Sequence, residues 1–183
     1  MAEAADPGRS VFLITSSLDE NHTHGTGFVV RRRGDTTWLL TCRHVVRDAG
    51  GPDAVRVDRL PVARVFMKAE GPEDLAVLEV QGMNPAPELR LGTGGGTKSP
   101  IKTVGFYLFE RKNDLKQRDA VYSIQPVEGE LGKPGGHEVK EVAGRVNTWH
   151  LEMRGNDHLK EGYSGSPVIE TSTGAVIGVV SHM

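Results

Sequence analysis

The octet EGYSGSPV, residues 161–168, sets Ser164 between two glycines and ends in a proline that can open a strand. A serine hydroxyl is a weak nucleophile until a base takes its proton and backbone N–H groups face the developing oxyanion. Gly162 would let the chain turn tightly enough to aim two amides into one pocket, and Gly165 would permit a close backbone approach. An ordinary glycine-containing β-turn fits the octet equally well, so both interpretations stay open on these residues alone.

A second motif, WLLTCRHVV at residues 38–46, runs from an apolar strand through Thr-x-x-His into two valines. This pattern predicts that His44 is held by packing at the end of a strand, as a general base requires. The alternative is a histidine without a chemical role, since six others compete. His22 and His24 lie in a polar loop, where paired histidines occasionally bind a metal, but no third ligand follows at a fixed spacing.

The third motif, EDLAVLEV at residues 73–80, places Asp74 directly before an alternating apolar strand. A carboxylate in this position could accept from an imidazole N–H, fix the tautomer and stabilise the imidazolium. The alternative is an aspartate that only caps a turn. Glu73 is a competing candidate, but Asp74 abuts the apolar run and is expected to be the more buried of the two.

Composition and patterning indicate an all-β chain. The sequence has 23 glycines among short, β-branched apolar runs, without a long 3.6-residue period. A single helical turn is expected over residues 44–48, and tight turns at 34–35 and 173–174. The predicted strands are residues 11–14, 27–33, 38–41, 54–57, 62–67, 75–80, 101–109, 120–126, 138–146, 149–153, 167–170 and 175–181.

The glycine-rich stretch 93–100 separates two nearly equal sets of predicted strands. We interpret it as a linker. This interpretation divides the chain into an N-terminal tail (1–9), a first β-barrel (10–92), the linker (93–100) and a second β-barrel (101–183). The alternative is a long surface loop within one barrel.

Charge and cysteine content limit the partners and the compartment. A formal net charge of −2 gives no electrostatic signature for nucleic acid or for an anionic membrane. Cys42 is the single cysteine, which excludes an internal disulfide and favours a reducing compartment. We find no export signal and no apolar stretch of bilayer length, so the sequence predicts a cytoplasmic protein.

Together these motifs resemble those of trypsin-like (chymotrypsin-fold) serine peptidases, especially the bacterial forms without disulfides. The matching segments are 41–46, 74–80 and 162–168, with GTGFVV at 25–30 and VGFY at 104–107. The order His44, Asp74, Ser164 is that of chymotrypsin-type enzymes and differs from the order in subtilisins and α/β-hydrolases. The resemblance implies two Greek-key β-barrels with the active site in the cleft between them, and no metal or cofactor.

The same resemblance assigns further residues. It implies an oxyanion hole from the backbone N–H groups of Gly162 and Ser164. It also implies that Ser181 helps to hold the aspartate and, with His158 and His182, belongs to the substrate-binding residues. His182 and Met183 fall on the edge that pairs with the substrate backbone. His158 falls near the base of the S1 pocket, where it and Lys160 would favour an acidic or polar P1 residue; alternatively, both lie on a solvated loop.

Several positions depart from the family pattern. Cys42 stands where small residues are usual, and Arg43 replaces an alanine beside the histidine. A third departure bears on activation. Tyr163 stands where trypsin has the aspartate that binds the new N-terminal amine after activation. Activation by that ion pair is therefore unavailable, and the loop must be ordered in another way.

The function implied is hydrolysis of peptide bonds through an acyl-enzyme, with a protein or peptide substrate. The alternatives are a latent or inactive peptidase fold that binds proteins, and an esterase on the same scaffold. The family normally continues with another strand and a helix beyond the position of Met183. We therefore expect a domain cut from a longer, regulated bacterial protein, with further domains as partners.

Overall fold

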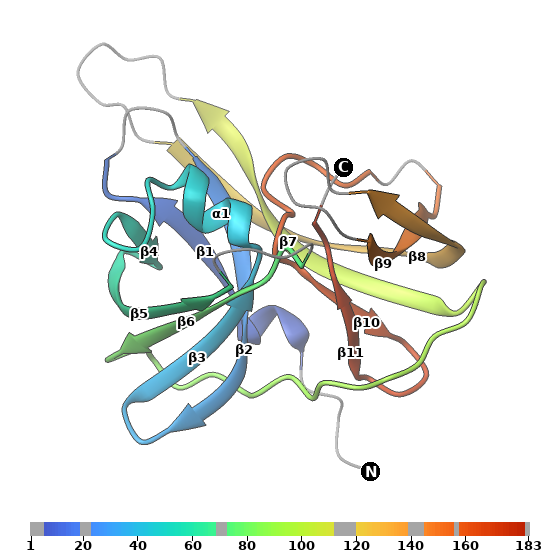
Figure 1. Ribbon diagram of the computed structural model, residues 1–183, viewed down its shortest axis with the longest axis horizontal. Helices are drawn as coiled ribbons and strands as arrows, with labels where there is room; N and C mark the ends of the chain where they lie inside the picture. The colour runs from blue at the N-terminus through green and yellow to red at the C-terminus, as the bar shows by residue number, and fades with distance from the viewer. Residues whose placement is uncertain are drawn as a thin grey trace.

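The computed structural model describes residues 6–18, 23–68, 73–111, 120–138, 145–155 and 158–181, and the all-β prediction is confirmed. Figure 1 shows a closed barrel on the left and a more open sheet on the right. The elements in chain order are the 3-10 helix η1 (Pro7–Ser10), β1 (Val11–Ser16), β2 (His24–Arg33), β3 (Thr36–Thr41), α1 (Arg43–Asp48), β4 (Val55–Val57), β5 (Leu60–Met67), β6 (Ala76–Gln81), β7 (Pro100–Arg111), β8 (Ala120–Glu138), β9 (Arg145–Met153), β10 (Pro167–Glu170) and β11 (Val176–Val179).

The first barrel closes in the strand order β1-β2-β3-β6-β5-β4, with every pair antiparallel. Alternate residues of β3 are buried, as the two-residue period of a strand requires. The predicted hairpin at residues 34–35 joins β2 to β3, and Gly34 adopts a φ of +59° there. Aliphatic side chains fill the interior, among them Ile14, Val29, Leu39, Val55, Leu78 and Val80.

The second half is an open five-stranded antiparallel sheet in the order β11-β10-β7-β8-β9. With the closed first barrel it gives the two-barrel chymotrypsin-like fold that the sequence predicts, the second barrel being a half-barrel. Its core includes Ile101, Val127 and the fully buried Tyr163. A third cluster joins the halves, because Val11 and Phe28 of the first pack with Val104, Ile169 and Val176 of the second.

Strand β8 differs from the sequence prediction. The sequence predicts a strand that ends at Pro126, yet β8 continues to Glu138. Pro126 lies opposite Val104 of β7, whereas β9 pairs with β8 only from Gly129 onward. One edge of β8 is therefore open at Pro126, where a missing N–H interrupts no described ladder on that side. The predicted strand 138–146 has its ends in β8 and β9, and residues 139–144 lie outside the described residues.

The segment between the halves contacts both of them. The N–H of Leu89 donates to the carbonyl of Val29 in β2, and the N–H of Gly92 donates to the carbonyl of Val176 in β11. Residues 93–99 contain no strand, and β7 begins at Pro100. The linker at 93–100 and the other domain boundaries stay predictions.

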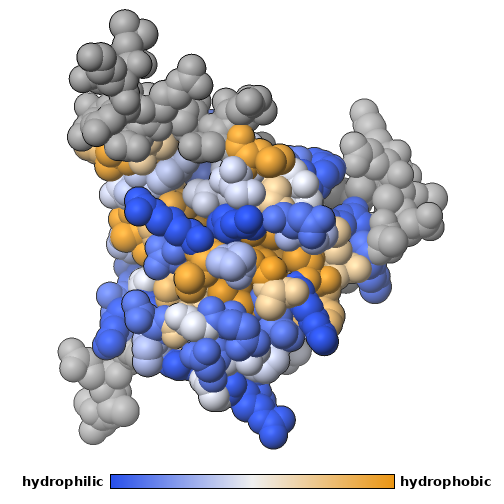
Figure 2. Space-filling model, turned by 90° about the vertical axis from the view of Figure 1, so that its left-hand side faces the viewer, coloured by the Kyte–Doolittle hydropathy of each residue, from blue (hydrophilic) through white to orange (hydrophobic). Residues whose placement is uncertain are grey.

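The surface of the first barrel carries both hydrophilic and hydrophobic side chains (Figure 2). Phe66 and Met67 of β5 and the neighbouring Leu75 are exposed and line a shallow groove. Among the helices of the described residues, none is both long and apolar enough to cross a lipid bilayer.

Candidate active site

His44 is oriented by contacts at the start of α1. Its backbone N–H donates to Asp74 Oδ1 at 2.9 Å, and its ring Nδ1 contacts Asp74 Oδ2 at 2.5 Å. A carboxylate at neutral pH can only accept, so Nδ1 carries the hydrogen. In the neutral ring, Nε2 is then the basic nitrogen. One carboxylate thus satisfies an N–H of the first helical turn and fixes the tautomer of the histidine.

Asp74 receives a third hydrogen bond, from the second half of the chain. Ser181 Oγ donates to Asp74 Oδ2 at 2.6 Å. Burial by itself would raise the pKa of Asp74, but the hydrogen bonds from His44 and Ser181 outweigh it and hold that pKa well below its ordinary value. The competing Glu73 instead forms an exposed ion pair with Lys68 at 2.9 Å. The structure therefore brings Asp74, and not Glu73, to the histidine.

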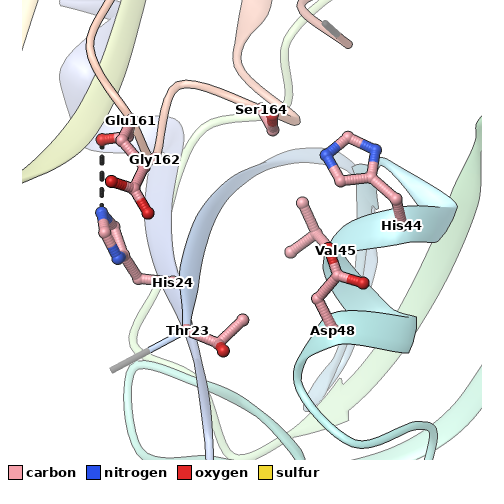
Figure 3. Close-up of a pocket in the computed structure, with 8 residues that line it drawn as sticks. All are labelled: Thr23, His24, His44, Val45, Asp48, Glu161, Gly162 and Ser164. Atoms are coloured by element: carbon pink, nitrogen blue, oxygen red, sulfur yellow. Dashed lines mark hydrogen bonds between the residues drawn. The ribbon is translucent and has the colours of Figure 1, made fainter. Parts of the chain in front are cut away.

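Ser164 lies on the loop before β10 and lines the same pocket as His44 (Figure 3). The loop is tied to both halves: the carbonyl of Ser164 accepts from Thr26 N–H at 2.9 Å, and Gly165 N–H donates to the carbonyl of Val180 at 2.7 Å. The Ser164 hydroxyl donates to the carbonyl of Ser181 at 3.0 Å. A change of χ1 rotamer redirects such a hydroxyl, and catalytic hydrogen bonds often form only with substrate present.

The peptide between Glu161 and Gly162 has a defined orientation. His24 Nε2 donates to the carbonyl of Glu161 at 3.2 Å, so this oxygen faces His24. The peptide is trans, and its N–H, on Gly162, must point the opposite way. The next carbonyl, that of Gly162, accepts from the buried Thr26 hydroxyl at 2.7 Å. Within the described part of the chain, no acceptor receives the N–H of Gly162 or that of Ser164.

Tyr163 fixes the loop of Ser164 to the second sheet. Its side chain is fully buried, and its hydroxyl donates to the carbonyl of Gln125 in β8 at 2.8 Å. The ring packs directly on Gly105 of β7, where an added Cβ would lie only 2.7 Å from a ring carbon. Tyr163, between Gly162 and Ser164, is thus held by packing in the core of the second sheet and by a hydrogen bond to β8.

A protein-family model adds the identification. The model for the trypsin-like peptidase domain matches residues 25–179, which is most of the chain. The chain belongs to the trypsin-like peptidase domain family. No curated protein is similar enough in sequence to match it.

Solved structures with the trypsin-like fold resemble the chain over nearly its whole length. The Rv3671c protease from M. tuberculosis in its active form aligns with a TM-score of 0.64 and 21% identity, covering 96% of this chain and 70% of that one. The inactive form of the Rv3671c protease aligns with a TM-score of 0.62 and 21% identity, covering 96% of this chain and 78% of that one. The scabies mite inactivated protease paralogue S-I1 aligns with a TM-score of 0.66 and 16% identity, covering 99% of this chain and 86% of that one. At these identities the likeness establishes the fold of the trypsin-like domain, and both active and inactive proteins share it.

Of the residues that the resemblance places near the substrate, the structure describes His158, Lys160 and Ser181. His158 is exposed and does not line the pocket of Ser164. Lys160 donates to Gln125 Oε1 and lies over the ring of Tyr107. His182 lies outside the described residues. The roles of His158, Ser181 and His182 in substrate binding stay predictions.

Sequence reasoning missed the roles of Thr26 and His24. The GTGF motif predicts a strand, but nothing in it reveals that the Thr26 hydroxyl reaches the loop of Ser164, 136 residues away. The sequence around His24 indicates only a loop histidine. Both contacts depend on how the two halves pack against each other. The residue pattern of either segment alone does not predict that packing.

Cys42, His44 and Asp74 offer ligand atoms within 4.8 Å of one another. Metal binding by cysteine requires the thiolate. Burial, and next the charge of Asp74, raise the pKa of the Cys42 thiol far above its ordinary value, and Sγ contacts the carbonyl of Val180 at 3.2 Å. The Cys42 thiol is therefore held protonated and hydrogen-bonded, a state in which it does not bind a metal.

Proposed function

We propose that this trypsin-like domain is a serine endopeptidase with Ser164 as nucleophile, His44 as general base and Asp74 as the group that orients His44. The observation that carries the proposal is the double contact of Asp74 with the backbone and ring of His44, in a pocket that Ser164 also lines. The side chains of His44 and Asp74 are only 18% exposed, which limits competition from water. A peptide or protein segment is the substrate.

The chemistry follows from the proton positions. Ser164 Oγ adds to the carbonyl carbon of the substrate while His44 Nε2 takes the hydroxyl proton, and Asp74 stabilises the imidazolium. The N–H groups of Gly162 and Ser164 bind the oxyanion. When the C–N bond breaks, His44 returns the proton to the leaving nitrogen and an acyl-enzyme remains. Water then attacks this ester by the same route and frees the acid.

Tyr163 supplies the loop order that trypsin obtains by activation. Its burial and its bond to Gln125, with the contacts of Thr26 and His24 to the neighbouring carbonyls, support a loop that is formed in the intact chain. We therefore expect activity without prior cleavage.

A fluorophosphonate probe tests the proposal directly. The purified, uncleaved protein should be labelled, and mass spectrometry should place the adduct on Ser164. Ser164→Ala and His44→Ala should each lower kcat by about four to six orders of magnitude and leave the circular dichroism spectrum unchanged. Labelling that appears only after limited proteolysis would contradict the role of Tyr163.

The second candidate is a latent peptidase fold that binds other proteins through the same pocket. One contact favours it: the Ser164 hydroxyl donates to Ser181 rather than to His44. A folded protein that never reacts with the probe, before or after proteolysis, would support this candidate and reject catalysis.

A further inference from the structure

The pocket beside Ser164 has a volume of about 380 Å³ and carries two carboxylates. Asp48 comes from the end of α1, and Glu161 directly precedes Gly162 on the loop. Figure 3 shows Glu161 on the left of the pocket and Asp48 on the right, with Val45 beside Asp48. Among the described residues that line this pocket, none is a lysine or an arginine.

The surrounding charges leave the pocket acidic. Asp48 has an ion pair with its neighbour Arg47 at 2.9 Å, but the two side chains are 46% and 62% exposed, so solvent screens this pair strongly. Glu161 has no ion pair with any described residue. The remaining titratable groups are His24, whose Nε2 donates to the carbonyl of Glu161, and His44 itself.

The chemistry of the proposed reaction says which part of a substrate enters this pocket. His44 must return its proton to the leaving nitrogen, so the residue that carries this nitrogen lies against His44. The pocket is bounded by His44, Val45 and Gly162, and it includes no residue of β11 or Ser181. The acyl part of the substrate then lies on the opposite side of Ser164, where the Ser164 hydroxyl donates to the Ser181 carbonyl.

From these observations we infer that the pocket selects a lysine or arginine directly after the scissile bond, with Asp48 and Glu161 as the specificity-determining residues. The long aliphatic stem of either side chain suits the apolar wall at Val45, and its cationic head reaches the carboxylates. This inference rests on the proposed function, because it describes the leaving side of the same reaction.

Acyl transfer measures this preference without knowledge of the natural substrate. p-Nitrophenyl acetate acylates Ser164 and releases p-nitrophenol. An added amine then attacks the acetyl ester: a C–N bond forms, the bond from the acyl carbon to Ser164 oxygen breaks, and the amine proton passes through His44 to Ser164. Argininamide and citrullinamide have nearly the same shape and differ in charge. The ratio of acetylated amide to acetate, corrected with Ser164→Ala, reports the preference of the pocket.

We expect argininamide to capture the acetyl group several-fold more efficiently than citrullinamide. Asp48→Asn and Glu161→Gln should each reduce this preference by about twofold to fivefold, the range for a charge pair near the surface. The double variant should abolish it, and 1 M NaCl should weaken it. The matched control is Asp35→Asn, which neutralises an exposed aspartate in the turn between β2 and β3 and should keep the wild-type ratio.

Two results would overturn the inference while the proposed function stands. They are equal capture of the two amides by the wild-type protein, and an undiminished preference in the double variant, each with normal release of p-nitrophenol and normal probe labelling. If the protein neither releases p-nitrophenol above the Ser164→Ala background nor reacts with the probe, the proposed function fails and this inference fails with it.

Discussion

The hydroxyl of Ser181 donates to Asp74 Oδ2 at 2.6 Å, and the same oxygen contacts His44 Nδ1. Asp74 belongs to the first half of the chain and Ser181 follows β11 in the second. A side chain from each half therefore fixes the carboxylate that orients the histidine. The geometry of His44 thus depends on the packing of the two halves.

Ser181→Ala should lower kcat about tenfold, because one hydrogen bond to a charged group contributes about 1.5 kcal/mol and its loss frees the carboxylate to turn. KM should change little, since the Ser181 carbonyl remains. Steady-state kinetics with an ester substrate measure both constants. Ser181→Thr keeps the hydroxyl and should retain most of the activity. Equal kcat values for Ser181→Ala and the wild type would show that this contact does not position Asp74.

Asp74→Asn should lower kcat by about three to four orders of magnitude, because an amide cannot stabilise the imidazolium and favours the wrong tautomer. Glu73→Gln is the neighbouring control. The wild-type Glu73 carboxylate pairs with Lys68 at the surface, so the activity of Glu73→Gln should stay within about twofold of the wild type. The reverse outcome, with Glu73→Gln inactive and Asp74→Asn active, would assign the orienting role to Glu73.

Stability should fall in acid partly through Asp74. Burial opposes the charge, but the bonds from His44 and Ser181 hold the pKa of the folded carboxyl well below its ordinary value. An unfolded aspartate has a pKa near 3.9, so below about pH 4 the unfolded chain takes up a proton that the folded chain refuses. This group then lowers the free energy of unfolding by up to about 1.4 kcal/mol per pH unit, until the pH passes the folded pKa.

Urea unfolding between pH 5 and pH 2.5 measures this dependence. Asp74→Asn lacks the titrating group and should show a shallower loss of stability over the same range. Parallel curves for the two proteins would mean that the folded and unfolded pKa values of Asp74 are alike.

Thr26→Val should destabilise the loop of Ser164. The Thr26 side chain is buried; its hydroxyl donates to the Gly162 carbonyl at 2.7 Å and accepts from the Phe106 N–H at 3.0 Å. Valine has the same shape but leaves both backbone groups without this partner, which costs about 2–4 kcal/mol in unfolding free energy. We expect kcat to fall as well, because the loop that carries the Gly162 and Ser164 N–H groups loses its bond to Thr26. Thr26→Ser should preserve both quantities, and a Thr26→Ser variant as defective as Thr26→Val would point to packing instead.

Gly165→Ala should prevent stable folding or cost more than about 3 kcal/mol. Gly165 has a φ of +89°, and a methyl group there would overlap the carbonyl oxygen of Thr26. Gly34→Ala is the matched control, with a φ of +59° in the β2–β3 turn and open space around the added carbon, so it should cost only about 1 kcal/mol. Thermal melts compare the two. Similar melting temperatures would show that backbone strain alone, without the overlap, sets the cost at Gly165.

Local sequence predicted the elements well where a single period governs them. The apolar run at residues 38–41 and the alternation at 75–80 placed β3 and β6, and the glycine at position 34 marked the hairpin between β2 and β3. The prediction that a strand ends at Pro126 was wrong, because whether a proline interrupts a strand depends on which edge of that strand is paired. The preference for Asp74 over Glu73 rested on the adjacent apolar run, and the structure brings Asp74 to His44.

The sequence by itself determined the chemistry available to this protein: a serine between glycines, a histidine at the end of a strand and an aspartate at the start of another, in the order of the trypsin-like family. These are properties of short segments, which periodicity and residue type report directly. The family resemblance also implied that Ser181 holds Asp74. Only the tertiary structure decided that Thr26, His24 and Tyr163 hold the loop of Ser164, and that Asp48 and Glu161 share one pocket. Each of these relations joins segments far apart in the chain, and it exists only because burial of the apolar faces packs the two halves together.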